Sequence, residues 1–468
     1  MLHSKKLIIS FVIAANLIVA LVYLYVDSLS SSHNRNSSHQ NQQQQRPPPY
    51  EQQHGLPQVG KGLVPRPTFD PNERYLAYLP HSGFHNQRIT LENALLLASY
   101  LNRTLLVPPV FLGPATEWRP FDILLRRLLL QTKRGLDHCG RIDKGDPLPA
   151  ECLNYYSWTT VEWDFFYDME KINKVQPWKY RPDHSFAWME AHLGIDRHKD
   201  VHIVYDQAHY DYQIYDNPKS TYPLNLKRYL RKLELKELSD RTERVLHMGS
   251  LFATGRVLAE LPEHKAFQQY LRRSMILSTP ILTKTSNAIV DKLGGLGSFV
   301  GLHLRVGDGM FVQPAPENIE NMFKSLVNIT GIDPIPNYQT LPASIPGDSA
   351  AAGDNNNNNN NNNNRNRFGP ERLDDTQCRA RKSEGGRYTT IYIATDGVYP
   401  RRNILFRKLF DHFPCIFTLD DFSDHLAELK DMKNYDGVGL SKDLIPMVDA
   451  VVSAKGSHFF GTPKSTFS

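Results

Sequence analysis

The sequence predicts an α/β protein with two units, each built around a parallel β-sheet. From about Glu73 onward, short apolar runs with strand character alternate with segments of helical spacing, which is the pattern of strands joined by crossover helices. The chain has 468 residues, of which 40% are hydrophobic and 22% are charged, as in ordinary globular proteins. This length favours two units, which we place at residues 67–295 and 296–468.

The first unit opens with a strand, a helix and a second strand. In chain order these are the apolar run Tyr75–Leu79, the helically spaced segment Thr90–Leu101 and the strand-like Thr104–Val107. Later strands are expected at Val201–Tyr205, Phe299–Leu304, Thr390–Ala394 and Cys415–Leu419, and later helices at His264–Leu293 and Arg402–Phe413. Because open α/β sheets bind ligands beyond the carboxyl ends of their strands, we expect the site residues there.

The N-terminal segment predicts a transmembrane anchor. Residues 7–26 form an apolar run broken by only two polar residues, and a helix of about 20 residues spans the hydrocarbon core of a bilayer. Lys5 and Lys6 precede the run, so the positive-inside bias keeps the tail, residues 1–6, in the cytosol and places the following residues in a lumen. A cleaved signal peptide is the alternative, but it calls for a shorter apolar region and a cleavage site of small residues.

Two further segments predict no packed structure. Residues 27–66 are rich in Ser, Asn, Gln and Pro, a composition that cannot bury enough apolar surface to fold, so we expect a disordered stem. Residues 313–374 are rich in Pro, Ala, Gly and Asn, and they include an unbroken run of asparagine over 355–364. A structureless stretch of this length predicts an exposed low-complexity insertion in the second unit.

The cysteines and the charges exclude several classes of protein. None of the four cysteines lies in a CxxC pair, which disfavours zinc-finger and thioredoxin-like sites. An even count in a lumen fits two disulfides. Proximity favours Cys139–Cys152 and Cys378–Cys415 among the three possible pairings, with buried thiols as the alternative. The net charge is only +5, and the basic clusters lack interleaved aromatic residues, so we expect no nucleic-acid partner.

The first candidate site is the turn between the first strand and the first helix. Its sequence over Ser82–Arg88 is SGFHNQR. A glycine at such a turn lets the backbone approach a ligand closely, and the helix N-terminus offers unpaired N–H groups to an anion. We take Gly83, Phe84 and Asn86 as candidate binding residues. A tight turn capped by the asparagine is the alternative.

The second candidate site lies at the end of the predicted strand SFVGLHLRV. His303 and Arg305 are two residues apart and therefore share one face of this strand. Polar side chains at the end of an apolar strand are costly unless they are paired or face a ligand. The planar guanidinium of Arg305 suits a diphosphate, and His303 can bond a phosphate or a hydroxyl. The alternative is a structural ion pair between Arg305 and Asp308.

Two more motifs come later in the chain. Asp396, in the segment IYIATDG, can accept hydrogen bonds from a ribose or a base, or it can cap the next helix. The segment GTPKSTFS over Gly461–Ser468 follows an apolar run and predicts a helix start. Hydroxyls and free N–H groups at a helix start suit a pyrophosphate, although an ordinary capped helix start is the alternative.

These four motifs, taken in order, resemble those of the GDP-fucose protein O-fucosyltransferase family. The likeness depends on the GFHNQ turn followed by NRTLLVPP, then HLR, then ATD, then GT-x-x-STFS, and it covers most of residues 75–468. The resemblance implies two Rossmann-like lobes of the GT-B type. It also implies that fucose is transferred from GDP-fucose to a hydroxyl, of a protein Ser or Thr or of a glycan, with inversion at the sugar carbon.

The resemblance also implies roles for the first two motifs. Asn86 would lie near the reacting centre, Arg305 would bind the β-phosphate, and His303 would help to position the nucleotide. Asp308 is a further candidate for binding the nucleotide; it lies three residues after the arginine, whereas some members place this acid one residue later. Arg305 and helix N–H groups would stabilise the negative charge that develops on the leaving phosphate.

The last two motifs would complete the nucleotide site. By resemblance, Asp396 would contact the nucleotide, while Ser465, Thr466 and Phe467 would hold the diphosphate and the base. Family members usually continue from this motif into another helix, whereas the printed sequence ends at Ser468. A membrane-tethered, non-catalytic protein of the same fold, binding a glycan or a nucleotide, is therefore the alternative function.

Neither a general base nor a metal site stands out. His81 and His85 lie near the first turn, which contains no carboxylate. The acidic pair Asp420–Asp421 precedes a helical segment and predicts an N-cap. We therefore expect a site without a metal ion or other cofactor.

The layout of anchor, stem and globular part predicts a location. Endoplasmic-reticulum and Golgi glycosyltransferases have this layout, and so do many tethered lectins and proteases. We expect a single-pass type II membrane glycoprotein of either compartment with its globular part in the lumen. Sequons at Asn36, Asn102 and Asn328 are compatible with passage through the secretory pathway.

Overall fold

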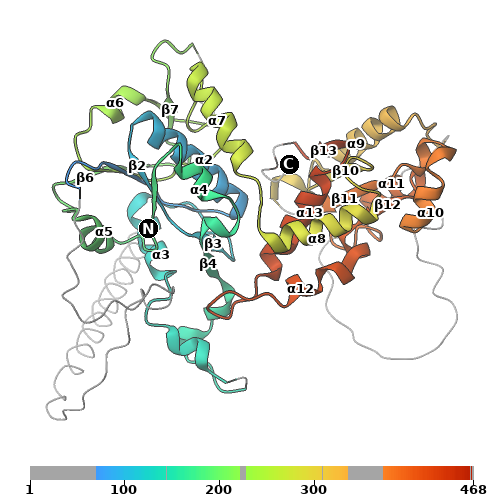
Figure 1. Cartoon of the computed structure of the whole chain (residues 1–468), viewed down its shortest axis with the longest axis horizontal. Helices are drawn as coiled ribbons and strands as arrows, with labels where there is room; N and C mark the ends of the chain where they lie inside the picture. The colour runs from blue at the N-terminus through green and yellow to red at the C-terminus, as the bar shows by residue number, and fades with distance from the viewer. Residues whose placement is uncertain are drawn as a thin grey trace, which may run out of the picture. The chain divides into compact units, whose positions relative to one another are not determined.

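Two parallel sheets organise the chain in the computed structural model (Figure 1). The residues that the structure describes are 70–143, 145–221, 228–307, 309–335, 373–463 and 465. The predicted tail, anchor and stem therefore lie outside the described residues. Within the described part of the chain, no helix is both long enough and apolar enough to cross a membrane.

The first sheet has five strands in the order β5-β2-β1-β9-β6, and every neighbouring pair is parallel. Its strands are β1 (Tyr75–Ala77), β2 (Thr104–Val107), β5 (Trp178–Tyr180), β6 (Val201–Val204) and β9 (Val245–Met248). The helices in this part of the chain are α2 (Phe84–Tyr100), α3 (Phe121–Leu130), α4 (Met169–Asn173), α5 (Phe186–Leu193), α6 (Leu235–Ser239) and α7 (Pro262–Ser274). The predicted alternation of strands and helices is confirmed here.

The second sheet has four parallel strands in the order β12-β11-β10-β13. Its strands are β10 (Val300–Leu304), β11 (Ile391–Thr395), β12 (Ile416–Thr418) and β13 (His458–Gly461). The associated helices are α8 (Pro280–Lys292), α9 (Ala315–Thr330), α10 (Asp375–Ala380), α11 (Arg407–His412), α12 (Ala427–Lys430) and α13 (Ser441–Ala454). The predicted α/β class with parallel sheets is therefore confirmed.

Smaller elements complete the described structure. Strands β3 (Val110–Leu112) and β4 (Thr159–Val161) pair antiparallel, and β7 (Tyr212–Tyr215) pairs parallel with β8 (Arg231–Glu234). The 3₁₀ turns are η2 (Asp137–Arg141), η3 (Ala150–Cys152), η4 (Tyr155–Ser157), η5 (Trp163–Phe165), η6 (Gly309–Phe311), η7 (Lys382–Glu384), η8 (Gly386–Tyr388), η9 (Ile404–Phe406) and η10 (Leu419–Leu426).

Helix α2 is the buried helix of the first sheet. All residues from Leu91 to Ala98 are buried, and the helix packs against β1, β2, β3 and α7. Burying one leucine side chain contributes roughly 1.5–3 kcal/mol, so this segment anchors the turn that precedes it. The helix begins at Phe84, six residues before the predicted Thr90, because the polar first turn interrupts the apolar spacing that marks the rest.

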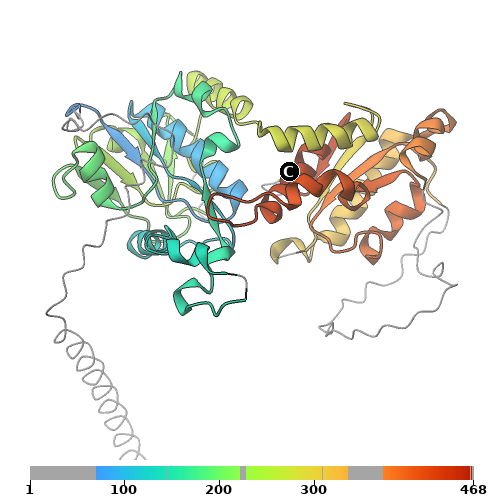
Figure 2. The same cartoon turned by 60° about the horizontal axis from the view of Figure 1, so that its bottom comes forward.

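The helix predicted over His264–Leu293 is two helices. Helix α7 ends at Ser274, and α8 begins at Pro280, which occupies the first turn of that helix. Proline is favourable at this position but breaks a helix interior, which explains why one continuous helix was a wrong prediction. Helix α8 packs beside α13 (Figures 1 and 2), although it precedes the boundary that we placed at residue 295.

The predicted insertion at 313–374 is wrong in its first part. Residues Ala315–Thr330 form α9, whose buried face is made by Ile319, Met322, Phe323 and Leu326. These positions have the i, i+3, i+4, i+7 spacing of an amphipathic helix, which the prolines and asparagines around them concealed. The run of asparagine belongs to residues 336–372, which lie outside the described residues.

Both favoured disulfides are present. Cys139 bonds to Cys152 with Cα atoms 5.4 Å apart, and Cys378 bonds to Cys415 with Cα atoms 5.7 Å apart. The second disulfide ties α10 to the start of β12. The described part of the chain contains no free cysteine, so the alternative of buried thiols is wrong.

Candidate active site at the carboxyl edges of the sheets

The first motif forms the turn from β1 into α2. Gly83 precedes the helix in an extended conformation, and Ser82 before it has a left-handed φ of 68°. Gln87 fixes this turn, because its amide nitrogen donates to the carbonyl oxygens of Ser82 (3.1 Å) and Phe111 (2.8 Å). Its amide oxygen also accepts from the N–H of Phe111 at 2.9 Å. Gln87 is therefore a structural residue that joins the turn to β3, a role that the sequence alone did not indicate.

Asn86 lies in the first turn of α2 but does not cap it. No side chain caps this helix start, and the Asn86 side-chain oxygen is buried without a donor among the described residues. A buried polar atom left unsatisfied costs roughly 1–3 kcal/mol, which a hydrogen bond from a ligand can recover. The geometry therefore favours a binding role for Asn86 over the alternative of a capping residue.

The second, third and fourth motifs meet at one edge of the second sheet. His303 pairs in register with Ala394 of β11 on one side and with Gly461 of β13 on the other. Strands β11 and β12 extend the sheet from one side of β10, whereas β13 returns on its other side. Such a reversal of strand order is where open parallel sheets bind ligands. The predicted residues therefore share the expected position.

Thr462 holds the backbone between His303 and Arg305. Its hydroxyl donates to the carbonyl oxygen of His303 at 2.9 Å and accepts from the N–H of Arg305 at 2.9 Å. Its own N–H donates to the same His303 carbonyl at 3.0 Å. We expected the hydroxyls of this motif to face a pyrophosphate, but the Thr462 hydroxyl is buried and joins β13 to β10.

Arg305 and Asp396 lie next to each other at this edge. The Arg305 Nε and the Asp396 Oδ2 are 3.8 Å apart, with side chains 30% and 38% exposed. The guanidinium also lies 4.6 Å from the centre of the Phe311 ring. A long, partly exposed ion pair contributes little stability, so this contact orients the guanidinium without neutralising it. Asp308, the partner of Arg305 in the alternative ion pair, lies outside the described residues, so that alternative is not tested.

Asp396 has a structural role that the sequence did not indicate. Its Oδ1 accepts from the N–H groups of Val306 (2.7 Å) and Gly307 (3.1 Å). It therefore caps the loop that leaves β10, a strand far away in sequence, and not the helix after its own strand. Only Oδ2 faces the guanidinium of Arg305, so a contact with a nucleotide stays a prediction.

The last motif is described in part. The N–H of Ser465 donates to the carbonyl oxygen of Thr462 at 3.2 Å, and Ser465 is buried. Ser465 therefore lies in the turn after β13, close to the residue that holds His303 and Arg305. Thr466 and Phe467 are outside the described residues, so their roles stay predictions, as does the expected helix start.

The histidines of the first two motifs both have lowered pKa values. Burial lowers the pKa of His303 to about 4, helped by the charge of Arg305. Burial also lowers the pKa of His85 to about 4, with further contributions from the charges of Arg88, His303 and Arg305. Both imidazoles are therefore neutral at neutral pH, and the arginine provides the positive charge. Neutral donors around a permanent cation suit a diphosphate.

His81 is a structural residue. Its Nδ1 lies 2.8 Å from the Ser82 hydroxyl and its Nε2 lies 2.6 Å from the Ser250 hydroxyl. Burial lowers its pKa to about 3, and the charges of His209 and Arg256 lower it further. With both ring nitrogens bonded, His81 has no lone pair available for a substrate proton.

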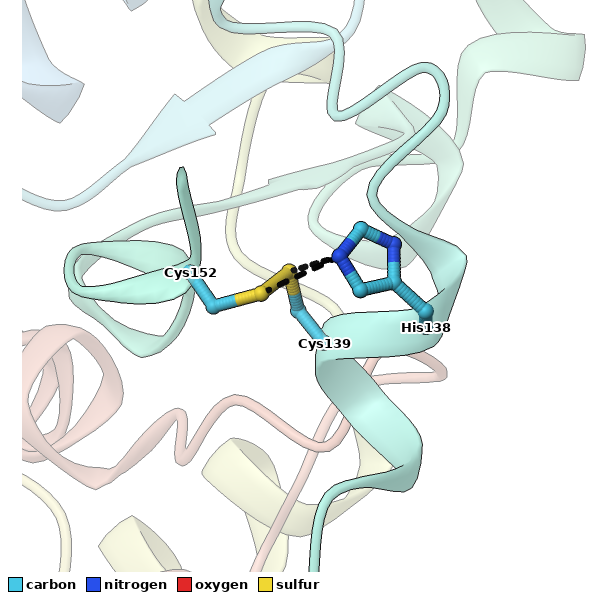
Figure 3. Close-up of side chains that lie close together, drawn as sticks. All are labelled: His138, Cys139 and Cys152. Atoms are coloured by element: carbon cyan, nitrogen blue, oxygen red, sulfur yellow. Dashed lines mark hydrogen bonds between the residues drawn. A yellow bond between two sulfur atoms is a disulfide. The ribbon is translucent and has the colours of Figure 1, made fainter. Parts of the chain in front are cut away.

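One group of side chains among the described residues has the spacing of a metal site (Figure 3). His138 Nε2 lies 3.6 Å from the Cys139 sulfur and 3.4 Å from the Cys152 sulfur. The two sulfurs are bonded to each other in the disulfide, so neither is the thiolate that a metal ion requires.

Asp421 accepts from the N–H of Thr418 in a capping box. Thr418 is the N-cap residue and Asp421 is the third residue of the helix, so the prediction of an N-cap at Asp420–Asp421 is wrong by two to three residues.

The family model of the GDP-fucose protein O-fucosyltransferases matches residues 159–468, well over half of the chain. The chain belongs to this family. Its members are glycosyltransferases, and the resemblance predicted from the four motifs is confirmed. The matched region contains the second, third and fourth motifs, whereas the turn around Asn86 precedes it.

The chain is also similar to one curated relative and to two solved structures of another protein. O-fucosyltransferase 30 of Arabidopsis thaliana is 55% identical over 55 residues, or 12% of this chain and 10% of the relative, so the chain matches a small part of that relative's length. A structure of POFUT1 in complex with GDP-fucose is 12% identical, with a TM-score of 0.35, covering 86% of this chain and 93% of that chain. A structure of POFUT1 in complex with GDP is 11% identical, with a TM-score of 0.33 and the same two coverages.

Proposed function

We propose that this chain transfers fucose from GDP-fucose to the hydroxyl of a protein Ser or Thr, with inversion at the sugar carbon. In this proposal the two parallel sheets form the two lobes of a GT-B-type enzyme. The main support is the position of Arg305, which lies at the strand reversal of the second sheet beside Asp396 and above Phe311. Family membership indicates the donor, since arginine recognises any diphosphate.

The reaction requires a stabilised leaving group. As the bond between the sugar carbon and the β-phosphate oxygen breaks, negative charge grows on that phosphate. Thr462 fixes the backbone of Arg305, and Asp396 and Phe311 orient its guanidinium. The positive charge is thus preorganised before the reaction, which is the most effective form of electrostatic catalysis. Asn86 supplies an amide near the sugar carbon, where it orients the reacting oxygens.

The same proposal includes a luminal location in the endoplasmic reticulum or Golgi, with residues 7–26 as the anchor of a type II membrane protein. The two disulfides support it, because such bonds form and persist in oxidising compartments. The sequon asparagines Asn102 and Asn328 are both exposed, as glycosylation requires. Mapping of glycans on protein from a eukaryotic cell tests the location, and unmodified sequons together with free cysteines would contradict it.

The decisive experiment measures GDP release and fucose transfer by the full chain purified in detergent. Arg305→Ala should lower the turnover number by about 10²–10³-fold, because it removes the charge that stabilises the leaving phosphate. Arg379→Ala is the matched control, since Arg379 lies in α10 and forms an exposed ion pair with Asp375. This control should keep wild-type activity.

Two outcomes would contradict the proposal in different ways. If the wild type binds GDP but never releases it from GDP-fucose, with or without a Ser- or Thr-containing acceptor protein, the non-catalytic alternative is correct. If Arg305→Ala transfers fucose at the wild-type rate, the chain is still an enzyme, but Arg305 is not the residue that binds the diphosphate.

A further inference from the structure

The proposed function requires side chains from two different sheets at one substrate. Asn86 follows β1 of the first sheet, whereas Arg305 follows β10 of the second sheet. A misplacement of about 1 Å between the groups that act on a substrate can lower a rate by about 10²-fold. The reaction therefore depends on the contacts that connect the two sheets.

A hairpin of the second unit provides such contacts. It consists of residues 432–440, directly before α13, and the N–H of Leu440 donates to the carbonyl oxygen of Met432 at 2.9 Å. Because α13 packs against β10 and β11, the base of the hairpin is fixed to the second sheet. At the other end, the N–H of Gly437 donates to the carbonyl oxygen of Asn434 at 2.9 Å, which closes the tip in a tight turn.

The tip of this hairpin bonds to β4 of the first unit. The amide nitrogen of Asn434 donates to the Thr159 hydroxyl at 2.5 Å and to the carbonyl oxygen of Thr160 at 3.0 Å. The Thr159 hydroxyl donates in turn to Oδ2 of Asp436 at 2.9 Å. Lys133 donates to the same oxygen of Asp436 at 2.5 Å, and the two side chains are only 11% and 4% exposed. The hydroxyl, the amide and the ion pair therefore form one connected and largely buried group.

Strand β4 connects this group to the first candidate motif. Thr160 pairs in register with Phe111 of β3. The N–H and the carbonyl oxygen of Phe111 both bond to the side chain of Gln87, which directly follows Asn86. A continuous set of hydrogen bonds and strand pairs thus leads from Asp436 in the second unit to the turn that contains Asn86.

We propose that Asp436 is a positioning residue for the transfer reaction, which holds Asn86 in place for the substrate that Arg305 binds. This inference rests on the proposed function and names a residue that does not itself touch the substrate. Removing one charge of a buried ion pair is strongly unfavourable, because the other charge is left without compensation. The pair with Lys133 therefore resists separation of the hairpin from β4. The alternative is that this group stabilises the fold without affecting the position of Asn86.

The first test uses Asp436→Asn, which keeps the shape of the side chain but leaves Lys133 without its counter-charge. The turnover number for transfer should fall by about 10²-fold, while GDP, which we place at the second sheet, should keep its affinity. Asp421→Asn is the matched control, because Asp421 forms a similarly buried ion pair with Arg401 (2.6 Å) inside the second unit. This control should lower stability and keep the wild-type turnover number.

A combination of substitutions separates positioning from simple stabilisation. If Asp436 acts through Asn86, then Asp436→Asn should have no further effect on the turnover number of Asn86→Ala, since residues that act as a unit are not additive. Effects that multiply overturn the inference. Should Asp436→Asn fail to fold, Asn434→Ala takes its place, because it removes two hydrogen bonds to β4 and leaves no buried charge without a partner.

The last test does not depend on turnover. Hydrogen exchange in Asp436→Asn should be faster than in the wild type at β3 and in the first turn of α2, while β10 and β11 keep their wild-type rates. Unchanged exchange at β3 and α2 overturns the inference. If exchange changes as expected but the wild type never transfers fucose, the proposed function is wrong instead.

Discussion

The carboxyl edges of the two sheets use their polar side chains in different ways. At the first edge, His81 bonds to the hydroxyls of Ser82 and Ser250, and Gln87 bonds to the backbone of the turn and of β3. At the second edge, Thr462 and Asp396 bond to the backbone of β10 and its loop, while the guanidinium of Arg305 stays partly exposed. The first edge is thus a rigid support for the turn into α2. The second edge fixes the backbone of Arg305, so that its charged side chain is held in a position from which it can bind a ligand.

The largest expected effect comes from a glycine beneath the second edge. A Cβ atom at Gly301 would lie 1.9 Å from the carbonyl oxygen of Ser453 in α13, so Gly301→Ala forces the helix away from β10. Overpacking against side chains already costs about 1–3 kcal/mol, and a clash with backbone costs more. We expect a loss of at least about 3 kcal/mol in unfolding free energy and strongly weakened GDP binding. Chemical denaturation and calorimetry measure these two quantities.

The matched substitution at the first edge should be mild. Gly83 has no atom within 4 Å of its would-be Cβ and an ordinary extended conformation, so Gly83→Ala should cost below about 1 kcal/mol. Equal destabilisation by the two substitutions would show that the second edge is not the more closely packed one.

The buried histidines and the buried Asp449 should respond to pH in opposite directions, and the second sheet contains a group of each kind, His303 and Asp449. Near the first sheet, burial lowers the pKa of His81 and His184 to about 3 and that of His247 well below its usual value. These groups stabilise the fold above pH 6.5, and this stability is lost as the pH falls, by roughly 1.4 kcal/mol per group and pH unit. In the second sheet, burial raises the pKa of Asp449 to about 7, although the Tyr392 hydroxyl donates to it. The stability that the protonated, buried carboxyl group of Asp449 contributes to the fold is complete below about pH 4 and is lost as the pH rises through 7.

Hydrogen exchange at pH 5 and pH 7.5, corrected for intrinsic rates, checks this contrast. Amides of β1 and β9 should open more readily at pH 5, and amides of β11 and α13 more readily at pH 7.5. Asp449→Asn should remove the loss of protection at pH 7.5 in the second sheet, keep the opposite contribution of His303 there, and leave the pH dependence of the first sheet unchanged. A parallel response of both sheets, or an unaltered response in Asp449→Asn, would contradict the assignment.

Local signals in the sequence predicted much of the fold. The strand Thr104–Val107 has the predicted bounds because two prolines end it. Helix α9 was missed because its apolar positions lie among prolines and asparagines, so composition concealed the spacing. The break before Pro280 was missed because the apolar spacing continues across it. Elements were therefore predictable where spacing and composition agree.

The site was predictable only in outline. The ends of strands indicated His303, Arg305 and Asp396, and these residues do share one sheet edge. The sequence could not show that β13 returns beside β10, since strand order is a property of the folded chain. For the same reason it could not show that Thr462 and Asp396 support backbone 90 or more residues away.

The smallest expected effect tests whether this support matters for binding. Thr462→Val keeps the shape of the side chain but leaves the N–H of Arg305 without its acceptor, which should cost about 1 kcal/mol in stability. The backbone of Arg305 would then be less well fixed, so GDP affinity should fall by about tenfold, a factor that corresponds to 1.4 kcal/mol. Thr132→Val, which removes a hydroxyl that donates to Leu129 at the end of α3, should lower stability to a similar extent and leave GDP affinity unchanged. If both variants bind GDP like the wild type, the hydrogen bonds of Thr462 hold the sheet together but do not prepare Arg305 for its ligand.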